Sequence, residues 1–343
     1  MKKKILIPVS IVLALALLLG GAFLYVRSAK PFHTGDLTGT AAQYPYEGRE
    51  TAPMEVRDTG AFVILQFTDT HFTTGKGKDA KTLKAIGDEV DRVRPDLVVI
   101  TGDMLEGHNS LIFYDKQGAT DAIAEMFEHR EQPWAYVPGN NDCEYLGTSE
   151  DVAAYLAKNY EYCILSNEPG PDGVAPFLTG ATQYAIPLLY ADGTVAHELL
   201  FMDSLGRDPD TNYLTYGYFK QDQANWLEGQ LMALKEEAPL ARASVFFHGN
   251  TPAFSDAFEE VWRNTEGSAV VDEAMARAGN VGLVSIGHIH PPVNWLAYLG
   301  RTYYQVVRAS GYSSTKTPGG VMITIYPGDG NPQRQYSFEE VVF

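Results

Sequence analysis

The sequence predicts a layered domain in which α-helices pack against β-sheets. Three observations support this class: short apolar runs rich in β-branched and aromatic residues, helical stretches that alternate with them, and polar residues directly after several of the runs. The chain has 343 residues, of which 45% are hydrophobic and 20% are charged, so it can bury a large core. This composition excludes a wholly disordered, collagen-like or coiled-coil chain.

Residues 1–30 predict a membrane-spanning signal anchor. Lys2, Lys3 and Lys4 precede an uncharged run over 5–26, which as a helix reaches the roughly 30 Å of a bilayer core. The positive-inside rule keeps the lysines in the cytoplasm, so we expect a single-pass protein of the cell membrane whose domain is extracytoplasmic. The alternative is a signal peptide cleaved near the small residues at 20–22, which leaves a secreted protein.

Residues 31–60 are rich in Thr, Gly and Pro and predict a linker, which leaves 61–343 as the folded domain. The formal net charge is -17, so the domain repels nucleic-acid backbone and we expect no binding to a duplex. Two cysteines, Cys143 and Cys163, are too few for a disulfide-built scaffold, and a bridge or two free thiols both stay open. The sequence gives no signal for the oligomeric state.

The predicted elements alternate along this domain. Buried strands, each short and continuously apolar, are expected at 62–67, 97–100, 135–137, 245–247 and 281–286. Helices are expected at 80–93, 120–129, 149–158, 221–236 and 268–278. Consecutive antiparallel strands, with a turn at 299–301, are expected at 293–299, 302–307 and 320–326.

Polar clusters follow the buried strands, at the sheet edge where α/β proteins bind ligands. They are Asp69-Thr70-His71, Gly102-Asp103, Gly139-Asn140-Asn141-Asp142, His248 and Gly287-His288-Ile289-His290. Their carboxylate and amide oxygens and imidazole nitrogens suit first-row metal ions. Two of the aspartates, one asparagine and the four histidines make a set of seven ligands, which exceeds the four that one tetrahedral ion takes. Two ions that share a carboxylate would use them all, activate water and hold a phosphoryl group.

The order of these motifs resembles that of the calcineurin-like metallophosphoesterases: DxH, GD, GNH followed by Asp or Glu, a lone His, and GHxH, from Asp69 to His290. The resemblance implies a four-layer α/β/β/α sandwich with the site at the C-terminal edges of two packed sheets. The residues alone predict only a layered α/β domain. Two further stretches, 216–227 and 308–312, resemble the branch that includes the fungal and plant purple-acid-phosphatase-like proteins.

The family's ligand roles carry over to this sequence as two sets that share one carboxylate. One metal ion is assigned Asp69, His71 and His290, and the other is assigned Asn140, His248 and His288. Asp103 is assigned the bridge between them. Mn, Fe, Zn and Co all remain open as the divalent or trivalent ions, because ligand type alone does not choose among them.

Two positions depart from the family pattern. Asn141 stands where the family has a histidine that is commonly assigned as proton donor to the leaving group; an amide donates a hydrogen bond to a phosphoryl oxygen but delivers no proton. His108 is a candidate replacement acid, with an exposed loop histidine as the alternative. Glu106 stands where purple acid phosphatases have tyrosine, so we expect no Tyr-to-Fe(III) chromophore.

We therefore expect a metal-dependent phosphoesterase in which a hydroxide held by two metal ions attacks phosphorus in line. Asp103, Asn141 and Arg308 are the candidate catalytic residues, Arg308 as a bidentate contact for phosphate, with a surface salt bridge as its alternative. The substrate class is a phosphorylated small molecule or another phosphoester, and its identity stays open. The competing hypothesis is a catalytically weakened, metal-bearing external binding module, a pseudo-phosphatase.

Overall fold

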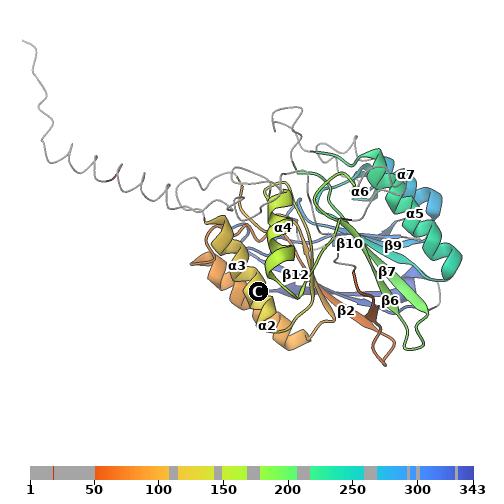
Figure 1. Cartoon of the computed structure of the whole chain (residues 1–343), viewed down its shortest axis with the longest axis horizontal. Coiled ribbons are helices and arrows are strands. Elements are labelled where there is room, and N and C mark those ends of the chain that lie inside the picture. The colour runs from red at the N-terminus through yellow and green to blue at the C-terminus, as the bar shows by residue number, and fades with distance from the viewer. Residues whose placement is uncertain are drawn as a thin grey trace, which may run out of the picture.

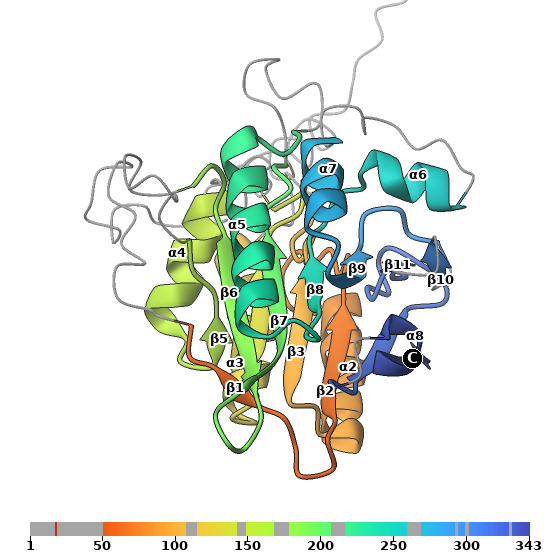
Figure 2. The same cartoon turned by 90° about the vertical axis from the view of Figure 1, so that its right-hand side faces the viewer.

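Two β-sheets packed face to face form the centre of the protein (Figure 1). The structure is a computed structural model, and it describes residues 18, 51–107, 115–142, 149–167, 178–206, 217–258, 269–291, 294–298, 302–328 and 331–343. Helices lie on the outer faces of both sheets, so the layers run helix, sheet, sheet, helix (Figures 1 and 2).

The two sheets have mixed strand directions. The seven-stranded sheet has the order β1-β6-β7-β8-β9-β11-β10. Its strands are β1 (Met54–Glu55), β6 (Gln183–Leu189), β7 (Val195–Met202), β8 (Ala243–Phe246), β9 (Val281–Ile286), β10 (Asn294–Tyr298) and β11 (Thr302–Val306). The six-stranded sheet has the order β13-β12-β2-β3-β4-β5. Its strands are β2 (Phe62–Phe67), β3 (Leu97–Thr101), β4 (Trp134–Val137), β5 (Cys163–Ile164), β12 (Gly319–Ile325) and β13 (Tyr336–Val342).

The helices divide between the two outer faces (Figure 2). The six-stranded sheet is covered by α2 (Lys78–Val93), α3 (Lys116–Glu128) and α4 (Ser149–Asn159). The seven-stranded sheet is covered by α5 (Gln221–Glu237) and α7 (Ala269–Ala278), with α6 (Pro252–Phe258) packed on α7 and a short α8 (Pro332–Gln335) before β13. The helices that cover the sheets bury apolar residues against them, such as Ile86 and Val90 of α2, and this burial drives the layering.

Aromatic rings fill the space between the sheets. Tyr184 of β6 stacks on Phe201 of β7 at 4.8 Å between ring centroids, and Phe201 stacks on Phe246 of β8 at 5.2 Å. The Tyr184 hydroxyl donates to the Tyr136 carbonyl oxygen of β4 at 3.0 Å and accepts from the Tyr136 backbone nitrogen at 3.1 Å. This side chain therefore fixes the position of one sheet relative to the other.

The five buried strands and the five helices expected from the sequence are present, with ends that differ by a few residues at most. Several elements differ from the prediction. The hairpin of β6 and β7 was not predicted, nor were the strands β1, β5 and β13 or the short helices α6 and α8. In addition, β12 does not continue the antiparallel series of β10 and β11. Instead β11 pairs in parallel with β9, while β12 crosses to the other sheet and pairs antiparallel with both β2 and β13.

The N-terminal prediction falls largely outside the described residues, which include only residue 18 of the expected anchor. In the part of the chain that the structure describes, no helix has both the length and the hydrophobicity required to cross a bilayer. The last residues of the expected linker lie on the domain: β1 pairs in parallel with β6, and Arg57 forms an ion pair with Asp96 at 2.7 Å. Cys163 is buried in β5, and Cys143 lies outside the described residues.

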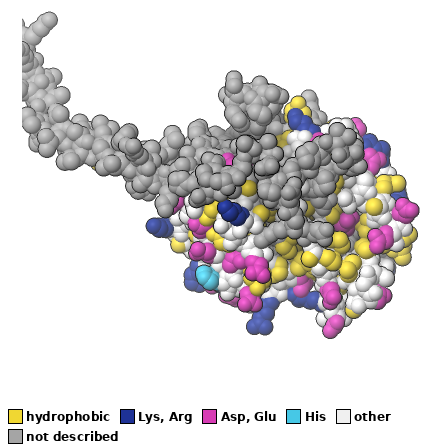
Figure 3. Space-filling model, viewed as in Figure 1, with side chains coloured by type: hydrophobic (Ala, Val, Ile, Leu, Met, Phe, Trp, Pro, Cys, Tyr) yellow, Lys and Arg dark blue, Asp and Glu magenta, His cyan; other side chains and the backbone are white. Residues whose placement is uncertain are grey.

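On one face of the molecule the charged side chains are dispersed (Figure 3). On the face of the molecule in Figure 3, acidic and basic side chains alternate with hydrophobic ones over the described part of the surface. The net charge of -17 is therefore not confined to one patch of this face.

Candidate metal centre

The candidate ligands lie in turns directly after buried strands, at one edge of the two sheets. On the six-stranded sheet they are Asp69 and His71 after β2, Asp103 after β3, and Asn140 and Asn141 after β4. On the seven-stranded sheet they are His248 after β8, and His288 and His290 after β9. The packing of the sheets thus brings together residues up to 221 positions apart in the chain.

Five of these residues have a left-handed backbone, which is uncommon outside glycine. The φ angles are 51° for Asp69, 47° for His71, 47° for Asp103, 69° for His288 and 58° for His290. Such conformations cost about 1–3 kcal/mol each and cluster at functional sites, where the surrounding structure holds them in place. The strain is therefore concentrated in the turns that carry the candidate ligands.

Two glycines allow these turns to approach closely. A Cβ atom on Gly139 would lie 2.3 Å from the backbone nitrogen of Asp103, and one on Gly102 would lie 2.6 Å from Nδ1 of His248. Gly102 also has a φ of 80°, which favours glycine. The glycines of the GD and GN motifs are thus required for the distance between neighbouring turns.

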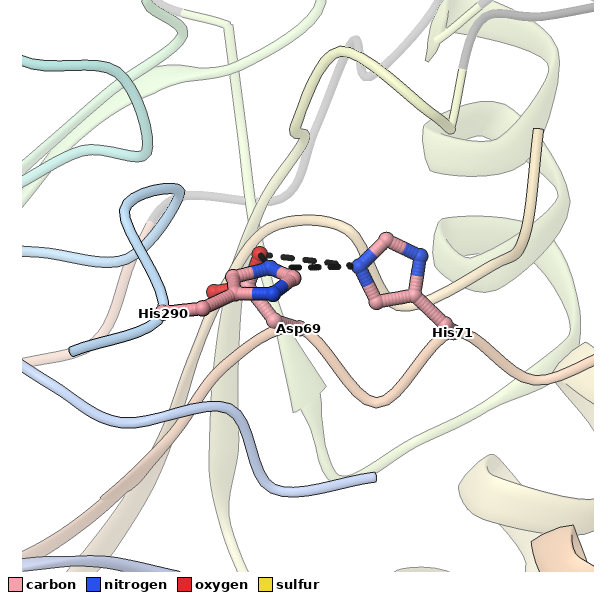
Figure 4. Close-up of side chains that lie close together, drawn as sticks. All are labelled: Asp69, His71 and His290. Carbon is pink, nitrogen blue, oxygen red and sulfur yellow. Dashed lines mark hydrogen bonds and ion pairs between the residues drawn. The ribbon is translucent and has the colours of Figure 1, made fainter. Parts of the chain in front are cut away.

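The first group of candidate ligands consists of Asp69, His71 and His290 (Figure 4). Nε2 of His290 lies 2.7 Å from Oδ1 of Asp69, and Nε2 of His71 lies 3.4 Å from Nε2 of His290 and 3.7 Å from the same carboxylate oxygen. Asp69 is fully buried, and its other oxygen accepts a hydrogen bond from the backbone nitrogen of His288 at 3.0 Å. The three side chains therefore converge on one small volume.

The second group consists of Asp103, His248 and His288. Nε2 of His248 lies 3.3 Å from Oδ1 of Asp103, and the rings of His248 and His288 meet edge to face at 5.1 Å between centroids. On its other side, Nδ1 of His248 lies 2.8 Å from the carbonyl oxygen of Thr101. Because that carbonyl requires a proton on Nδ1, Nε2 is left as the acceptor that faces the group.

Asp103 connects the two groups. Its Oδ2 lies 3.7 Å from Nε2 of His71 in the first group, while its Oδ1 faces His248 in the second. One carboxylate thus presents an oxygen to each group, which is the arrangement that a ligand shared by two ions requires.

Asn141 contacts Asp103 with both its backbone and its side chain. Its backbone nitrogen donates to Oδ1 at 2.7 Å, and Nδ2 donates to Oδ2 at 2.6 Å. One proton of this amide therefore binds the carboxylate between the two groups, and the predicted hydrogen bond from Asn141 to a phosphoryl oxygen stays a prediction. Asn140, the neighbouring residue, is 6% exposed at the same edge.

Asp142, which ends the third motif, and Lys116 support this loop, and neither residue has a role assigned from the sequence. The carboxylate of Asp142 accepts from the backbone nitrogens of Gly139 and Leu105, each at 2.8 Å, so it joins the turn after β4 to the turn after β3. Lys116 at the start of α3 is fully buried and donates to the backbone oxygen of Asp142. Asp142 has a sequence signal, because it is the acidic residue that ends the third motif, whereas a single lysine at the start of a helix has none.

Arg308 has other contacts. Its guanidinium forms an ion pair with Glu340 of β13 and donates to the carbonyl oxygen of Thr317 at 3.2 Å. These contacts match the salt bridge that was the alternative for this residue. Two residues further on, the backbone nitrogen of Ser310 donates to the oxygen of Thr68, so this stretch supports the turn before Asp69. His108 lies outside the described residues.

The electrostatics of the site are set by opposed burial and charge. Burial opposes ionisation of Asp69, but the charge and hydrogen bond of His290 outweigh it and hold the pKa of Asp69 well below its usual range. Burial likewise disfavours the imidazolium of His248, yet the charge of Asp103 raises its pKa to about 9. Burial lowers the pKa of His288 to about 4. In the absence of metal, the carboxylates are therefore ionised and bound protons occupy part of the histidine set, so metal binding must release protons.

These residues fit a pair of metal ions. Nε2 of His248 is buried and faces Oδ1 of Asp103 at 3.3 Å, but it makes no hydrogen bond of suitable geometry among the described residues. A buried polar atom that lacks a hydrogen bond is costly, and a metal ion at this position would satisfy it. The donor set of imidazole nitrogens and carboxylate oxygens is the one that Mn, Fe, Zn and Co accept.

Comparisons with known proteins agree with this geometry. The family model described as calcineurin-like phosphoesterase matches residues 62–292. A relative named "Probable inactive purple acid phosphatase 28", from Arabidopsis thaliana, is 25% identical over 276 residues, which cover 69% of this chain and 68% of that protein. Phosphatase DCR2 of Saccharomyces cerevisiae is 27% identical over 221 residues, or 59% of this chain and 36% of that protein.

A solved structure shares the fold. A dimetal phosphatase from Danio rerio superposes with a TM-score of 0.54 at 14% sequence identity, covering 82% of this chain and 99% of that one. At this identity, the likeness concerns the arrangement of the helices and sheets.

Proposed function

Because this chain belongs to the calcineurin-like phosphoesterases, we propose that it hydrolyses phosphoesters at a centre of two metal ions held by the two ligand groups. The observation that carries the proposal is the position of Asp103, which presents one oxygen to His71 and the other to His248. Asp69, His71 and His290 would hold one ion, and Asn140, His248 and His288 the other. When bound, the ions would lower the pKa of a coordinated water molecule and neutralise charge on the phosphate.

Neighbouring residues hold the proposed metal ligands in a fixed orientation. Asn141 holds both oxygens of Asp103, so the shared carboxylate cannot rotate away from either group. The carbonyl of Thr101 keeps the His248 ring turned with Nε2 toward Asp103. Such preorganised groups need no rearrangement during the reaction, which is the main source of electrostatic catalysis.

The proposal includes a preference for good leaving groups. Asn141 has no proton to deliver, and its amide is bonded to Asp103. The leaving group of an aryl phosphate or a phosphoanhydride departs without being protonated. The leaving group of an alkyl phosphate needs a proton, so hydrolysis of that ester loses the rate enhancement of about 10²–10⁴-fold that a general acid typically supplies. Arg308 is omitted from the phosphate contacts because its charge is paired with Glu340.

The test is hydrolysis of an aryl phosphate by the full chain, after chelation and again with Mn, Zn, Co or Fe restored. We expect turnover only with metal, and its loss in Asp103→Ala. Asp88→Ala, which removes an exposed carboxylate on α2, is the matched control and should keep full activity. Turnover that needs no metal, or that persists in Asp103→Ala, would contradict the proposal.

A second function, binding of a phosphorylated ligand without turnover, is favoured by the same position 141 and by the word "inactive" in the name of the Arabidopsis relative. The two functions differ in a direct measurement. A chain that holds two metal ions and a phosphate analogue but leaves every ester intact is a binding module, and loss of one acid alone would slow turnover by a finite factor.

We also propose that the domain is displayed outside the cytoplasm, anchored by residues 5–26. The support is the uncharged run itself and the three lysines before it. Protease added to intact cells should digest the domain, and alkaline carbonate should leave it in the membrane pellet. Release into the medium of a protein that lacks residues 5–26 would instead indicate cleavage of the segment.

A further inference from the structure

His71 has two faces with different surroundings. Its Nε2 points into the first ligand group, 3.4 Å from Nε2 of His290. Its Nδ1, on the opposite side of the ring, lies 3.3 Å from Oε2 of Glu106. The imidazole is thus held between the candidate metal position and a carboxylate that belongs to neither ligand group.

The backbone fixes this pair. The segments after β2 and β3 run side by side and form a parallel bridge between Phe72 and Leu105. The backbone nitrogen of Phe72 donates to the oxygen of Met104 at 2.9 Å, and that of Glu106 donates to the oxygen of Phe72 at 3.0 Å. Glu106 is therefore placed beside His71 by paired main chains, unlike a surface ion pair between two mobile side chains.

Burial gives the contact further weight. The His71 side chain is 9% exposed and that of Glu106 is 22% exposed, so water competes little for either. Charged contacts are stronger where solvent is excluded.

The second group has a different partner at the same ring atom. Nδ1 of His248 faces the neutral carbonyl oxygen of Thr101 at 2.8 Å, whereas Nδ1 of His71 faces an ionisable carboxylate. A carboxylate behind a metal-binding histidine fixes the tautomer and raises the basicity of the ligating nitrogen more than a carbonyl does. The two groups are therefore chemically unequal although each contains one carboxylate and two histidines.

We propose that Glu106 is a positioning residue for His71: it accepts the Nδ1 proton, holds the ring with Nε2 toward the ion of the Asp69 group, and strengthens the binding of that ion alone. This inference rests on the proposed metal centre. It gives position 106, where the sequence showed only the absence of a tyrosine, a role of its own.

The test is titration of the full metal-depleted chain with Co(II), followed by its visible absorption and by competition with a chromophoric chelator. In Glu106→Gln, which keeps the side chain's shape and removes its charge, we expect the dissociation constant of one ion to rise about 10–100-fold. The other ion should bind as in the unchanged chain. Glu106→Asp retains the charge and should recover a large part of the loss.

Glu125→Gln is the matched control, because it removes one charge from an exposed position on α3 without contact to either group. It should leave both dissociation constants unchanged. Equal constants in Glu106→Gln and the unchanged chain would overturn the inference, as would equal weakening of both ions. If Glu106→Asp binds as weakly as Glu106→Gln, the charge at position 106 is not the cause.

This experiment separates the inference from the proposed function. Titration of the unchanged chain tests whether two ions bind at all, and the aryl phosphate assay tests turnover. A chain that binds two ions with unequal dependence on Glu106 supports the inference even when no ester is cleaved.

Discussion

Asn141 donates two hydrogen bonds to one carboxylate, from its backbone nitrogen to Oδ1 of Asp103 at 2.7 Å and from Nδ2 to Oδ2 at 2.6 Å. Asn141, which stands where the family has a proton-donating histidine, thus orients the carboxylate that faces both ligand groups. One proton of the Asn141 side-chain amide is used in the bond to Oδ2 of Asp103, so a hydrogen bond to a substrate would have to come from the second proton on Nδ2.

The exchange Asn141→His should restore a proton donor at this position. We expect the turnover of an alkyl phosphate to rise by about 10-fold or more. A general acid typically increases the rate by about 10²–10⁴-fold, and the loss of the side-chain hydrogen bond from position 141 to Asp103 offsets part of this gain. Aryl phosphate turnover should change little. The measurement is the ratio of kcat/KM for the two esters, and a ratio unmoved by the exchange would contradict the role assigned to position 141.

Metal binding should stabilise the fold. A ligand that binds only the folded chain at 100 times its dissociation constant adds about 2.7 kcal/mol per site to the free energy of unfolding. We therefore expect chelation to lower the melting temperature and Mn or Zn to restore it. In His248→Ala the restored increment should shrink, whereas His129→Ala, at an exposed histidine, should behave as the unchanged chain. The comparison is made by calorimetric unfolding with and without metal.

Removal of the Asp142 carboxylate should separate the turns after β3 and β4. Asp142→Ala leaves the backbone nitrogens of Gly139 and Leu105 buried without their acceptor, at about 1–3 kcal/mol each. We expect the free energy of unfolding, measured by urea denaturation, to fall by about the sum of these two costs. Asp151→Ala, at a partly exposed position on α4, should cost far less. A loss no larger than that of this control would show that water reaches the two nitrogens.

His197 should make the fold sensitive to acid. Burial lowers its pKa to about 3, against about 6.5 in an unfolded chain, so between these values the unfolded chain binds the extra proton. Its contribution to stability is therefore complete above pH 6.5 and is lost as the pH falls toward 3, by about 5 kcal/mol in all. His197→Gln should remove this loss, and urea unfolding at a series of pH values measures it. His129→Gln should keep the pH dependence of the unchanged chain.

The strands that carry the candidate ligands could be predicted because both of their faces are buried. A strand such as β3, with every residue buried, reads as one apolar run. The β6 and β7 hairpin has no such run: Pro187 interrupts β6, and β7 contains His197 and Glu198. His197 is buried and lies 2.9 Å from Ser244 on the next strand, a partner that the local sequence does not reveal.

In the site, too, the sequence predicts local motifs but not the contacts between distant segments. Each ligand motif lies within a few residues directly after a strand, so the candidate ligands could be identified from the order of the strands. The contacts of Glu106, Lys116 and Arg308 depend on which segments pack together, and these pairs are separated by between 26 and 35 positions. A charged residue with several possible partners in the sequence has one partner in the fold, and only the packed sheets decide which.

The two ligand groups draw on turns from both sheets, and this has a consequence for how the protein is made. Contacts between distant segments form late, because the chain must first close the long loops between them. The two ligand groups are therefore complete only when the second sheet has docked, after the part of the chain near residue 290 has been synthesised. Under the proposed function the metal ions would bind after this docking, so a chain that holds both ions would be one whose two sheets have assembled.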